Sequence, residues 1–195
     1  MLGVDAIGLV FDRASRRALD VEAGARLRRQ VPAFVSVVAL FRNSEAALVE
    51  AVIESVQPDL LQFHGEEGGA DCRRYGRRYA KAFAMGGDAN TSAMLAEFAD
   101  ASALLLDSHA PGALGGTGRS FDWTRIPATL ASRVILAGGL SPANVEQAVT
   151  MVRPFAVDVS SGIEKAPGEK DPARMRAFVA AVRRADSGGS GRDSV

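Results

Sequence analysis

The stretch Val134-Ile135-Leu136-Ala137-Gly138-Gly139 decides the fold, because it places a short apolar run directly before a pair of glycines. Two other stretches of the chain repeat this arrangement. An apolar run bounded by breakers is typical of a buried parallel strand. Glycines at its end let backbone N–H groups converge on an anion, because no Cβ blocks the approach. The runs are 103–106, 134–137 and 155–159, and the loops after them are Gly115-Gly116-Thr117-Gly118, Gly138-Gly139 and Ser160-Ser161-Gly162. Three such loops at the same end of successive strands predict one phosphorylated ligand at one rim of an α/β barrel.

Predicted strands alternate with predicted helices along the whole chain. Mostly continuous apolar strands in such an alternation indicate a parallel sheet covered on both faces. A doubly wound open sheet and a (β/α)₈ barrel both satisfy this pattern, but glycine loops late in the chain favour the barrel. We therefore predict an α/β fold, a (β/α)₈ TIM barrel of which this chain holds seven of the eight strands. The strands are 6–11, 34–41, 59–63, 80–84, 103–106, 134–137 and 155–159, and the helices are 21–30, 45–56, 70–78, 92–99, 142–152 and 172–184.

Length and composition narrow the class of protein. The 195 residues suit one domain, which we place at 1–185, followed by a flexible tail at 186–195. Lys plus Arg equals Asp plus Glu at 23 each, so the net charge gives no case for a nucleic acid or a membrane as partner. No apolar run reaches the roughly 20 residues of a membrane span, and the first residues lack a signal-peptide pattern. A single cysteine fits a cytoplasmic location, and one cysteine with two histidines argues against a metal site.

Polar side chains near the ends of predicted strands are the candidates for chemistry. Asp107 follows a buried strand, where a carboxylate can act as a general acid, although Asp after a strand is most often a cap or loop residue. His64 ends another strand and is either a proton carrier or a structural histidine. Arg17 can pair with a carboxylate or belong to a solvated basic patch. A buried Asp158 can bind a substrate hydroxyl or tie loop amides together.

Cys72 is the only thiol and therefore invites assignment as a nucleophile or base. It lies inside the predicted helix 70–78, away from any strand end. A buried cysteine on a helix face is the better interpretation. We therefore expect no catalytic role for it.

Several blocks of the chain resemble the signature sequences of the phosphoribosylanthranilate isomerase family, in the same order and spacing. The resemblance runs from about residue 3 to residue 182. The blocks are Leu61-Gln62-Phe63-His64-Gly65-Glu66-Glu67, Leu105-Leu106-Asp107-Ser108, Gly115-Gly116-Thr117-Gly118-Arg119-Ser120-Phe121-Asp122-Trp123, Ala137-Gly138-Gly139-Leu140-Ser141-Pro142-Ala143-Asn144-Val145 and Val157-Asp158-Val159-Ser160-Ser161-Gly162-Ile163-Glu164, with Gly8-Leu9-Val10-Phe11 and Ser15-Arg16-Arg17 near the start.

The resemblance implies a (β/α)₈ barrel enzyme of tryptophan biosynthesis that needs no metal or organic cofactor. Its reaction is an Amadori rearrangement, in which an acid opens the furanose ring to a Schiff base and a base then removes the C2′ proton. By resemblance, Asp107 takes the position of the general acid and Arg17 that of the arginine that holds the anthranilate carboxylate. His64 and Asp158 are supporting residues. The phosphate-binding residues are Gly115, Gly116, Gly118, Gly138, Gly139, Ser160, Ser161 and Gly162. Members of the family are monomers or homodimers.

One departure from the family concerns the general base, which the family places on its first strand in a Lys-Ile-Cys-Gly type of sequence. The chain contains no such segment, and Cys72 does not match that position. Three explanations are open: Met1 is an internal residue of a longer enzyme, the chain is an inactive copy, or another chain supplies the strand. We favour the first because every later motif is intact.

Three functions follow from these observations. The leading one is the isomerase, with turnover by the 195 residues strongly reduced or absent, and restored by preceding sequence that contains a Cys-Gly strand. The alternative is a non-catalytic phosphosugar-binding barrel that lacks the general-base cysteine. A weaker third is another phosphate-binding barrel enzyme, which unchanged activity of an Asp107→Asn variant would favour.

Overall fold

The computed structural model describes residues 2–85, 95–107 and 122–189, and these residues form two compact units. The first unit is Val4–Phe83 with Asn90–Leu104, and the second is Met1–Gly3, Ala84–Ala89 and Leu105–Val195, each within its described part. The one-domain assignment of 1–185 stays a prediction. In the described residues, no helix is both long enough and apolar enough to cross a membrane.

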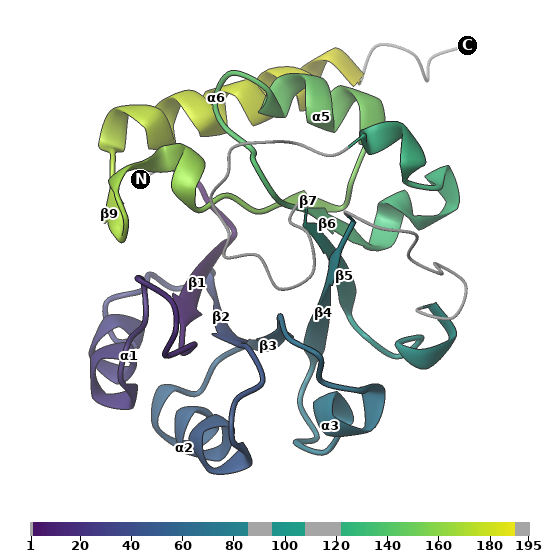
Figure 1. Ribbon diagram of the computed structural model, residues 1–195. Helices are drawn as coiled ribbons and strands as arrows, with labels where there is room; N and C mark the ends of the chain where they lie inside the picture. Colours follow the sequence, from purple (N-terminus) through teal and green to yellow (C-terminus); the bar gives the residue numbers. More distant parts are fainter. Residues whose placement is uncertain (1, 86–94, 108–121, 190–195) are drawn as a thin grey trace. The chain divides into compact units, whose positions relative to one another are not determined.

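Parallel strands build the first unit. Strands β1 (Ala6–Val10), β2 (Ser36–Phe41), β3 (Leu60–Phe63) and β4 (Tyr79–Ala84) pair in sequence order, and each of the three pairings is parallel. Helices α1 (Val21–Arg28), α2 (Ala46–Val56) and α3 (Gly69–Arg73) connect successive strands (Figure 1). This repeated strand–helix unit is the one that the alternation of apolar runs and amphipathic stretches predicts.

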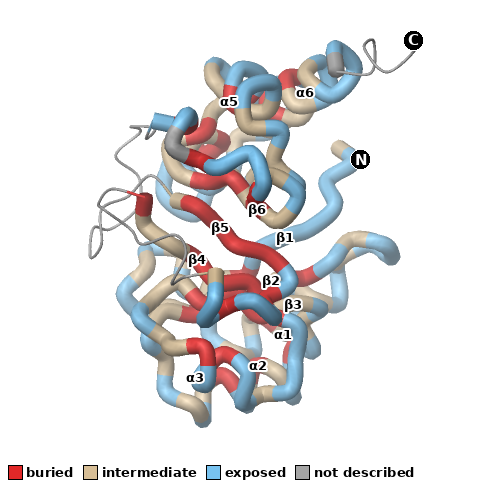
Figure 2. Tube along the Cα trace, turned by 90° about the vertical axis from the view of Figure 1, so that its right-hand side faces the viewer, coloured by how far each residue is buried: buried red, intermediate tan, exposed pale blue. Residues whose placement is uncertain are grey.

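The core of the first unit lies between its strands and its helices. Phe11, Phe41 and Phe63 come from three successive strands or strand ends and stack with ring centroids 5.8 and 5.9 Å apart. Helix α2 buries Val49, Val52 and Val56 almost completely, as the helical spacing of its apolar residues predicts. In Figure 2 the buried residues follow β2, β3 and β4, whereas most of β1 is exposed.

A glycine lets helix α1 approach strand β1. A Cβ on Gly24 would lie 2.7 Å from the ring of Phe11, so a larger residue would push the helix away. The helix begins at Asp20, whose carboxylate accepts a hydrogen bond from the Ala23 N–H at 2.6 Å.

The second unit holds the later strands and two long helices. Strand β5 (Ala103–Asp107) ends in it, and β6 (Val134–Leu136) pairs with β7 (Ala156–Val157) in parallel. Helices α5 (Val145–Val152) and α6 (Pro172–Gly189) lie side by side, and Arg184 of α6 bonds Glu146 of α5 at 2.9 Å (Figure 1). Its short elements are the 3₁₀ helices η1 (Trp123–Arg125), η2 (Ala128–Arg133) and η3 (Ser161–Ile163) and the hairpin β8 (Glu164–Ala166) with β9 (Glu169–Lys170).

All seven predicted strands occur in the described residues, and their order in the sheet is the order of the sequence. Several helix boundaries differ from the prediction. Helix α3 ends at Arg73 because Gly76 takes a left-handed φ of 59°, and α5 begins at Val145 rather than 142. The hairpin β8–β9, which turns at Gly168 with φ 84°, was not predicted.

The end of the chain differs from the prediction as well. Helix α6 continues to Gly189, past the predicted helix end at 184, with the Ser187 hydroxyl donating to the Arg183 carbonyl at 2.8 Å. The flexible tail at 186–195 stays a prediction. The remaining tail residues, 190–195, lie outside the described residues, as do residues 92–94 of the predicted helix 92–99. Residues 95–97 of that helix are helical.

Candidate functional site

Two of the predicted site residues follow the carboxyl ends of strands in the first unit. Arg17 lies in the connection between β1 and α1, where its backbone N–H donates to the Ser15 hydroxyl at 3.1 Å and its side chain is half-buried. His64 is the first residue after β3 and is also half-buried. The structure thus places both residues at the strand ends where the sequence predicts them.

The backbone and the ring of His64 each have a defined neighbour. Its N–H donates to the Phe41 carbonyl at 2.8 Å, which fixes it beside the end of β2. Its ring Nδ1 lies 3.5 Å from Nε2 of the buried Gln62. The roles of donor and acceptor in this contact depend on the tautomer of the imidazole ring.

Two of the three glycine loops meet in the second unit. Gly138 and Gly139 follow β6 with φ of 79° and 65°, which side chains with a Cβ rarely adopt. A Cβ on Gly162, after β7, would lie 1.9 Å from the carbonyl oxygen of Leu140. The two loops therefore touch through their backbones, and only glycine fits at that contact. Within the described residues, the backbone N–H groups of Gly138 and Gly139 donate a hydrogen bond to no protein group.

Polar side chains that the sequence does not single out hold these loops in place. The Asn144 side chain accepts from the Ser141 N–H at 2.8 Å and donates to the Gly139 carbonyl at 3.0 Å. Lys170 of the hairpin donates to the Ser160 carbonyl at 3.1 Å and to the buried carboxylate of Glu164 at 2.9 Å. The hairpin therefore braces the loop after β7. No local signal identifies the contact of Lys170 with Ser160, because the two residues belong to different segments of the chain.

Asp107 and Asp158 complete the predicted residues of the second unit. Asp107 is the last residue of β5, and its half-buried side chain stands at the carboxyl end of that strand. Asp158 donates its N–H to the Leu136 carbonyl at 2.9 Å, but its side chain is exposed. The expectation of a buried Asp158 is therefore wrong, because β7 ends one residue earlier, at Val157. Gly115, Gly116 and Gly118 lie outside the described residues, so that loop stays a prediction.

Cys72 is buried on helix α3, as predicted. Its side chain is fully buried, and burial raises the pKa of the thiol to about 12. A thiol with such a pKa carries almost no thiolate near neutral pH and is a poor base or nucleophile. Across the described residues, no three His, Cys, Asp or Glu side chains are grouped to hold a metal ion.

We expect a Cys72→Ala variant to keep the catalytic and binding properties of the parent chain, because the thiol faces the core rather than a strand end. The measurement is kcat and KM with and without the substitution, in a chain to which preceding sequence with a Cys-Gly strand has been added. A selective loss of kcat in a folded Cys72→Ala protein would contradict the structural assignment.

The stability of the chain is expected to fall in alkali between about pH 9 and pH 12. Burial raises the pKa of Cys72 from 9.0 to about 12, and burial together with the hydrogen bond to Asp100 raises the pKa of Tyr79 from 10.0 to about 12. Because both pKa values are higher in the folded state, the unfolded chain loses these protons first, and the free energy of unfolding decreases as pH rises through this window. Urea unfolding at pH 8 and pH 11 measures the effect. Cys72→Ala should lose less stability than the parent, and equal losses in the two proteins would contradict this account.

Comparison with known proteins places the chain in a family. The family model of N-(5′-phosphoribosyl)anthranilate (PRA) isomerase matches residues 2–181. The chain belongs to the PRA isomerase family. A PRA isomerase from Nitrosococcus oceani is 48% identical over 181 residues, which are 93% of this chain and 88% of the relative. One from Stenotrophomonas maltophilia is 52% identical over 188 residues, which are 95% of this chain and 86% of the relative.

Solved structures of PRA isomerases share the fold. The enzyme from Thermotoga maritima has a TM-score of 0.84 at 34% identity, covering 94% of this chain and 90% of its own. A PRA isomerase in complex with reduced 1-(o-carboxyphenylamino)-1-deoxyribulose 5-phosphate has a TM-score of 0.80 at 34% identity, with 94% and 89% covered. The predicted α/β fold of the (β/α)₈ type, with seven strands in its larger sheet among the described residues, is confirmed.

Proposed function

We propose that this chain isomerises N-(5′-phosphoribosyl)anthranilate to 1-(2-carboxyphenylamino)-1-deoxyribulose 5-phosphate in tryptophan biosynthesis. The observation that carries the proposal is the match to the PRA isomerase family over residues 2–181, in a chain whose glycine loops after β6 and β7 abut. Two loops whose backbones are in contact suit a phosphate when N–H groups such as those of Gly138 and Gly139 donate to no protein group among the described residues. Gly138, Gly139 and the loop Ser160-Ser161-Gly162 are the proposed phosphate site.

The chemistry follows from the residues at the strand ends. Asp107 protonates the furanose ring oxygen, which opens the ring to a Schiff base. A base then removes the proton from C2′, and the resulting enolamine tautomerises to the ketone. Arg17 pairs with the anthranilate carboxylate, while His64 and Asp158 support the bound substrate. Each step is a proton transfer, so the mechanism requires no cofactor.

The described residues contain no thiol that is suited to act as the general base. The only cysteine of the sequence is the buried Cys72, whose pKa of about 12 disqualifies it. This observation favours a second candidate function, a non-catalytic barrel that binds phosphosugars. A dimeric PRA isomerase is known from Thermotoga maritima, and for this chain we expect a monomer or a homodimer.

Two proteins separate the candidates: the 195-residue chain, and an extended chain in which a strand carrying Cys-Gly is added ahead of Met1. Each is assayed for PRA turnover through the fluorescence of the anthranilate group, and for binding of the reduced ketose analogue. The isomerase proposal predicts turnover by the extended chain. Binding by both proteins with turnover by neither supports the binding barrel. Absence of both binding and turnover contradicts both candidates.

A further inference from the structure

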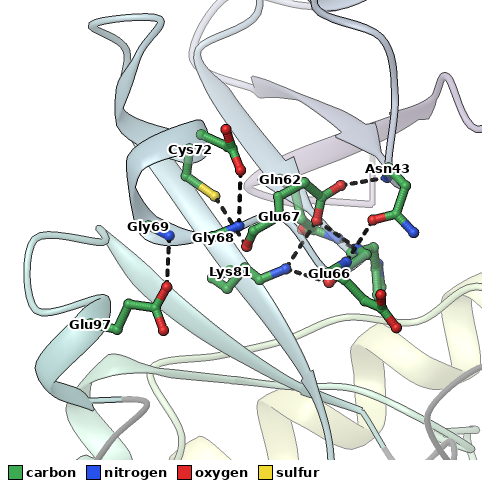
Figure 3. Close-up of polar contacts among 12 residues, drawn as sticks. Asn43, Gln62, Glu66, Glu67, Gly68, Gly69, Cys72, Lys81 and Glu97 are labelled. Atoms are coloured by element: carbon green, nitrogen blue, oxygen red, sulfur yellow. Dashed lines mark hydrogen bonds and ion pairs between the residues drawn. The ribbon is translucent and has the colours of Figure 1, made fainter.

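The ammonium of Lys81 is buried in the first unit, in contact with the loop that begins with His64. Lys81 lies on β4 with its side chain only 4% exposed, which is rare for lysine. Its Nζ donates to the Gly65 carbonyl at 2.5 Å and to the Glu67 carboxylate at 3.0 Å (Figure 3). The ammonium also lies 6.0 Å from the centre of the Phe98 ring. The Lys81 ammonium is therefore held by the Gly65 carbonyl and the Glu67 carboxylate of the β3–α3 loop, with the Phe98 ring nearby.

Glu67 uses both carboxylate oxygens, and they join two loops. One oxygen accepts from the Asn43 N–H at 2.6 Å, and the other accepts from the Gly65 N–H at 2.8 Å as well as from Lys81. Asn43 belongs to the β2–α2 loop. Its side-chain oxygen accepts a second hydrogen bond between the two loops, from the Glu66 N–H at 2.6 Å (Figure 3).

Gly65 is the point where these loops come closest. A Cβ there would lie 2.2 Å from the side-chain oxygen of Asn43 and 2.7 Å from its backbone nitrogen. The ion pair between Lys81 and Glu67 thus links strand β4 to the loops after β2 and β3. Both of its members also bond the backbone of Gly65, the residue directly after His64.

A buried ion pair is a weak device for stability alone, because the cost of removing both charges from water offsets most of their attraction. An apolar pair of similar size often stabilises a core as well. What Lys81 and Glu67 provide that an apolar pair cannot is a set of hydrogen bonds to loop backbone, at Gly65 and Asn43. The geometry therefore favours a role in placing the loop.

We propose that Lys81 and Glu67 are positioning residues, which fix the β3–α3 loop so that His64 is held in one orientation at the catalytic rim. The proposal rests on the proposed isomerase function for the role of His64 in the reaction. The backbone of His64 is anchored on one side by Phe41, and the ion pair anchors the chain on the other side, at Gly65.

The first test reads His64 directly and needs no substrate. The double variant Lys81→Met/Glu67→Gln removes both charges together, so that neither is left buried and unpaired. Correlation of the imidazole nitrogens and protons by NMR, assigned with a His109→Gln variant, reports the tautomer. The parent should show a single tautomer of His64, and the double variant an average of both tautomers. Unchanged His64 signals in the folded variant would overturn the proposal.

The second test is kinetic, in the extended chain. Loss of positioning should lower kcat by about 10- to 100-fold with little change in KM. The matched control, Arg26→Met/Glu22→Gln, removes an exposed ion pair of helix α1 and should leave both constants unchanged. An unchanged kcat despite altered His64 signals would overturn the positioning role.

Two further outcomes are separable. If the unsubstituted proteins neither bind nor turn over substrate, the proposed function fails, and the NMR test still decides whether the ion pair holds His64. If the double variant does not fold, Glu67→Asp replaces it in both tests. That variant keeps the charge but shortens the reach to Asn43, and the same results support or overturn the proposal.

Discussion

Replacing Asp107 with Asn in the extended chain is expected to lower kcat/KM for PRA by about 10²- to 10⁴-fold, the usual contribution of a general acid. The side chain stands half-buried at the carboxyl end of β5, and an amide of nearly the same shape is far too weak an acid to transfer a proton to the furanose oxygen. Binding of the reduced ketose analogue, which needs no proton transfer, should stay nearly unchanged. Steady-state kinetics and calorimetric titration measure the two quantities.

The matched control for this variant is Asp5→Asn, which makes the same chemical change at an exposed position just before β1. It should leave both quantities as in the parent. If Asp107→Asn retained the activity of the parent, Asp107 would not be the acid. The third function, a different phosphate-binding barrel enzyme, would then gain support.

Replacing Gly162 with Ala is expected to weaken binding of the reduced analogue by about 10²-fold, because one or two hydrogen bonds to the phosphate, each worth about 1.5–3 kcal/mol, would be lost. The added Cβ would lie 1.9 Å from the Leu140 carbonyl oxygen and 3.0 Å from its carbon, and both are backbone atoms that cannot rotate away. The loops after β6 and β7 must then separate, which misplaces the amides of Gly138 and Gly139. We expect a lower melting temperature as well, since overpacking strains the loops.

The control for the glycine variant is Gly188→Ala in helix α6, where a Cβ would meet nothing within 4 Å. That change should leave binding unaffected and preserve or raise the melting temperature, because alanine favours helix more than glycine does. Binding by Gly162→Ala that equals that of the parent would show that the contact between the two loops does not shape the ligand site.

The elements and strand ends could be predicted because their signals are local. The apolar run before His64 and the glycines after β6 each indicate, within a few residues, where a strand lies and ends. Both strands, β3 and β6, are found where expected. The same holds for the start of the predicted helix 172–184, where the Asp171 carboxylate accepts from the Ala173 and Arg174 N–H groups.

The support of the site could not be predicted, because it depends on pairs that are distant along the chain. Lys81 reads as one residue of a short strand, and only the fold brings it to Glu67, fourteen residues away. Likewise, Lys170 reaches Ser160 through a hairpin whose strands are too short for an alternating pattern to show.

Helix α5 begins later than predicted, at Val145, because the Asn144 side chain bonds the Ser141 and Gly139 backbones. A Pro at 142 suggests an earlier start.

The most direct test of the central claim is a calorimetric titration of the 195-residue chain with reduced 1-(o-carboxyphenylamino)-1-deoxyribulose 5-phosphate. The claim is that this chain binds the ligand of a PRA isomerase, with the glycine loops after β6 and β7 on its phosphate and Arg17 on its carboxylate. It predicts saturable binding of one ligand per chain, weakened in Gly162→Ala and in Arg17→Met and intact in Gly188→Ala. No saturable binding by the folded parent chain, or equal binding by all of these variants, would contradict the claim.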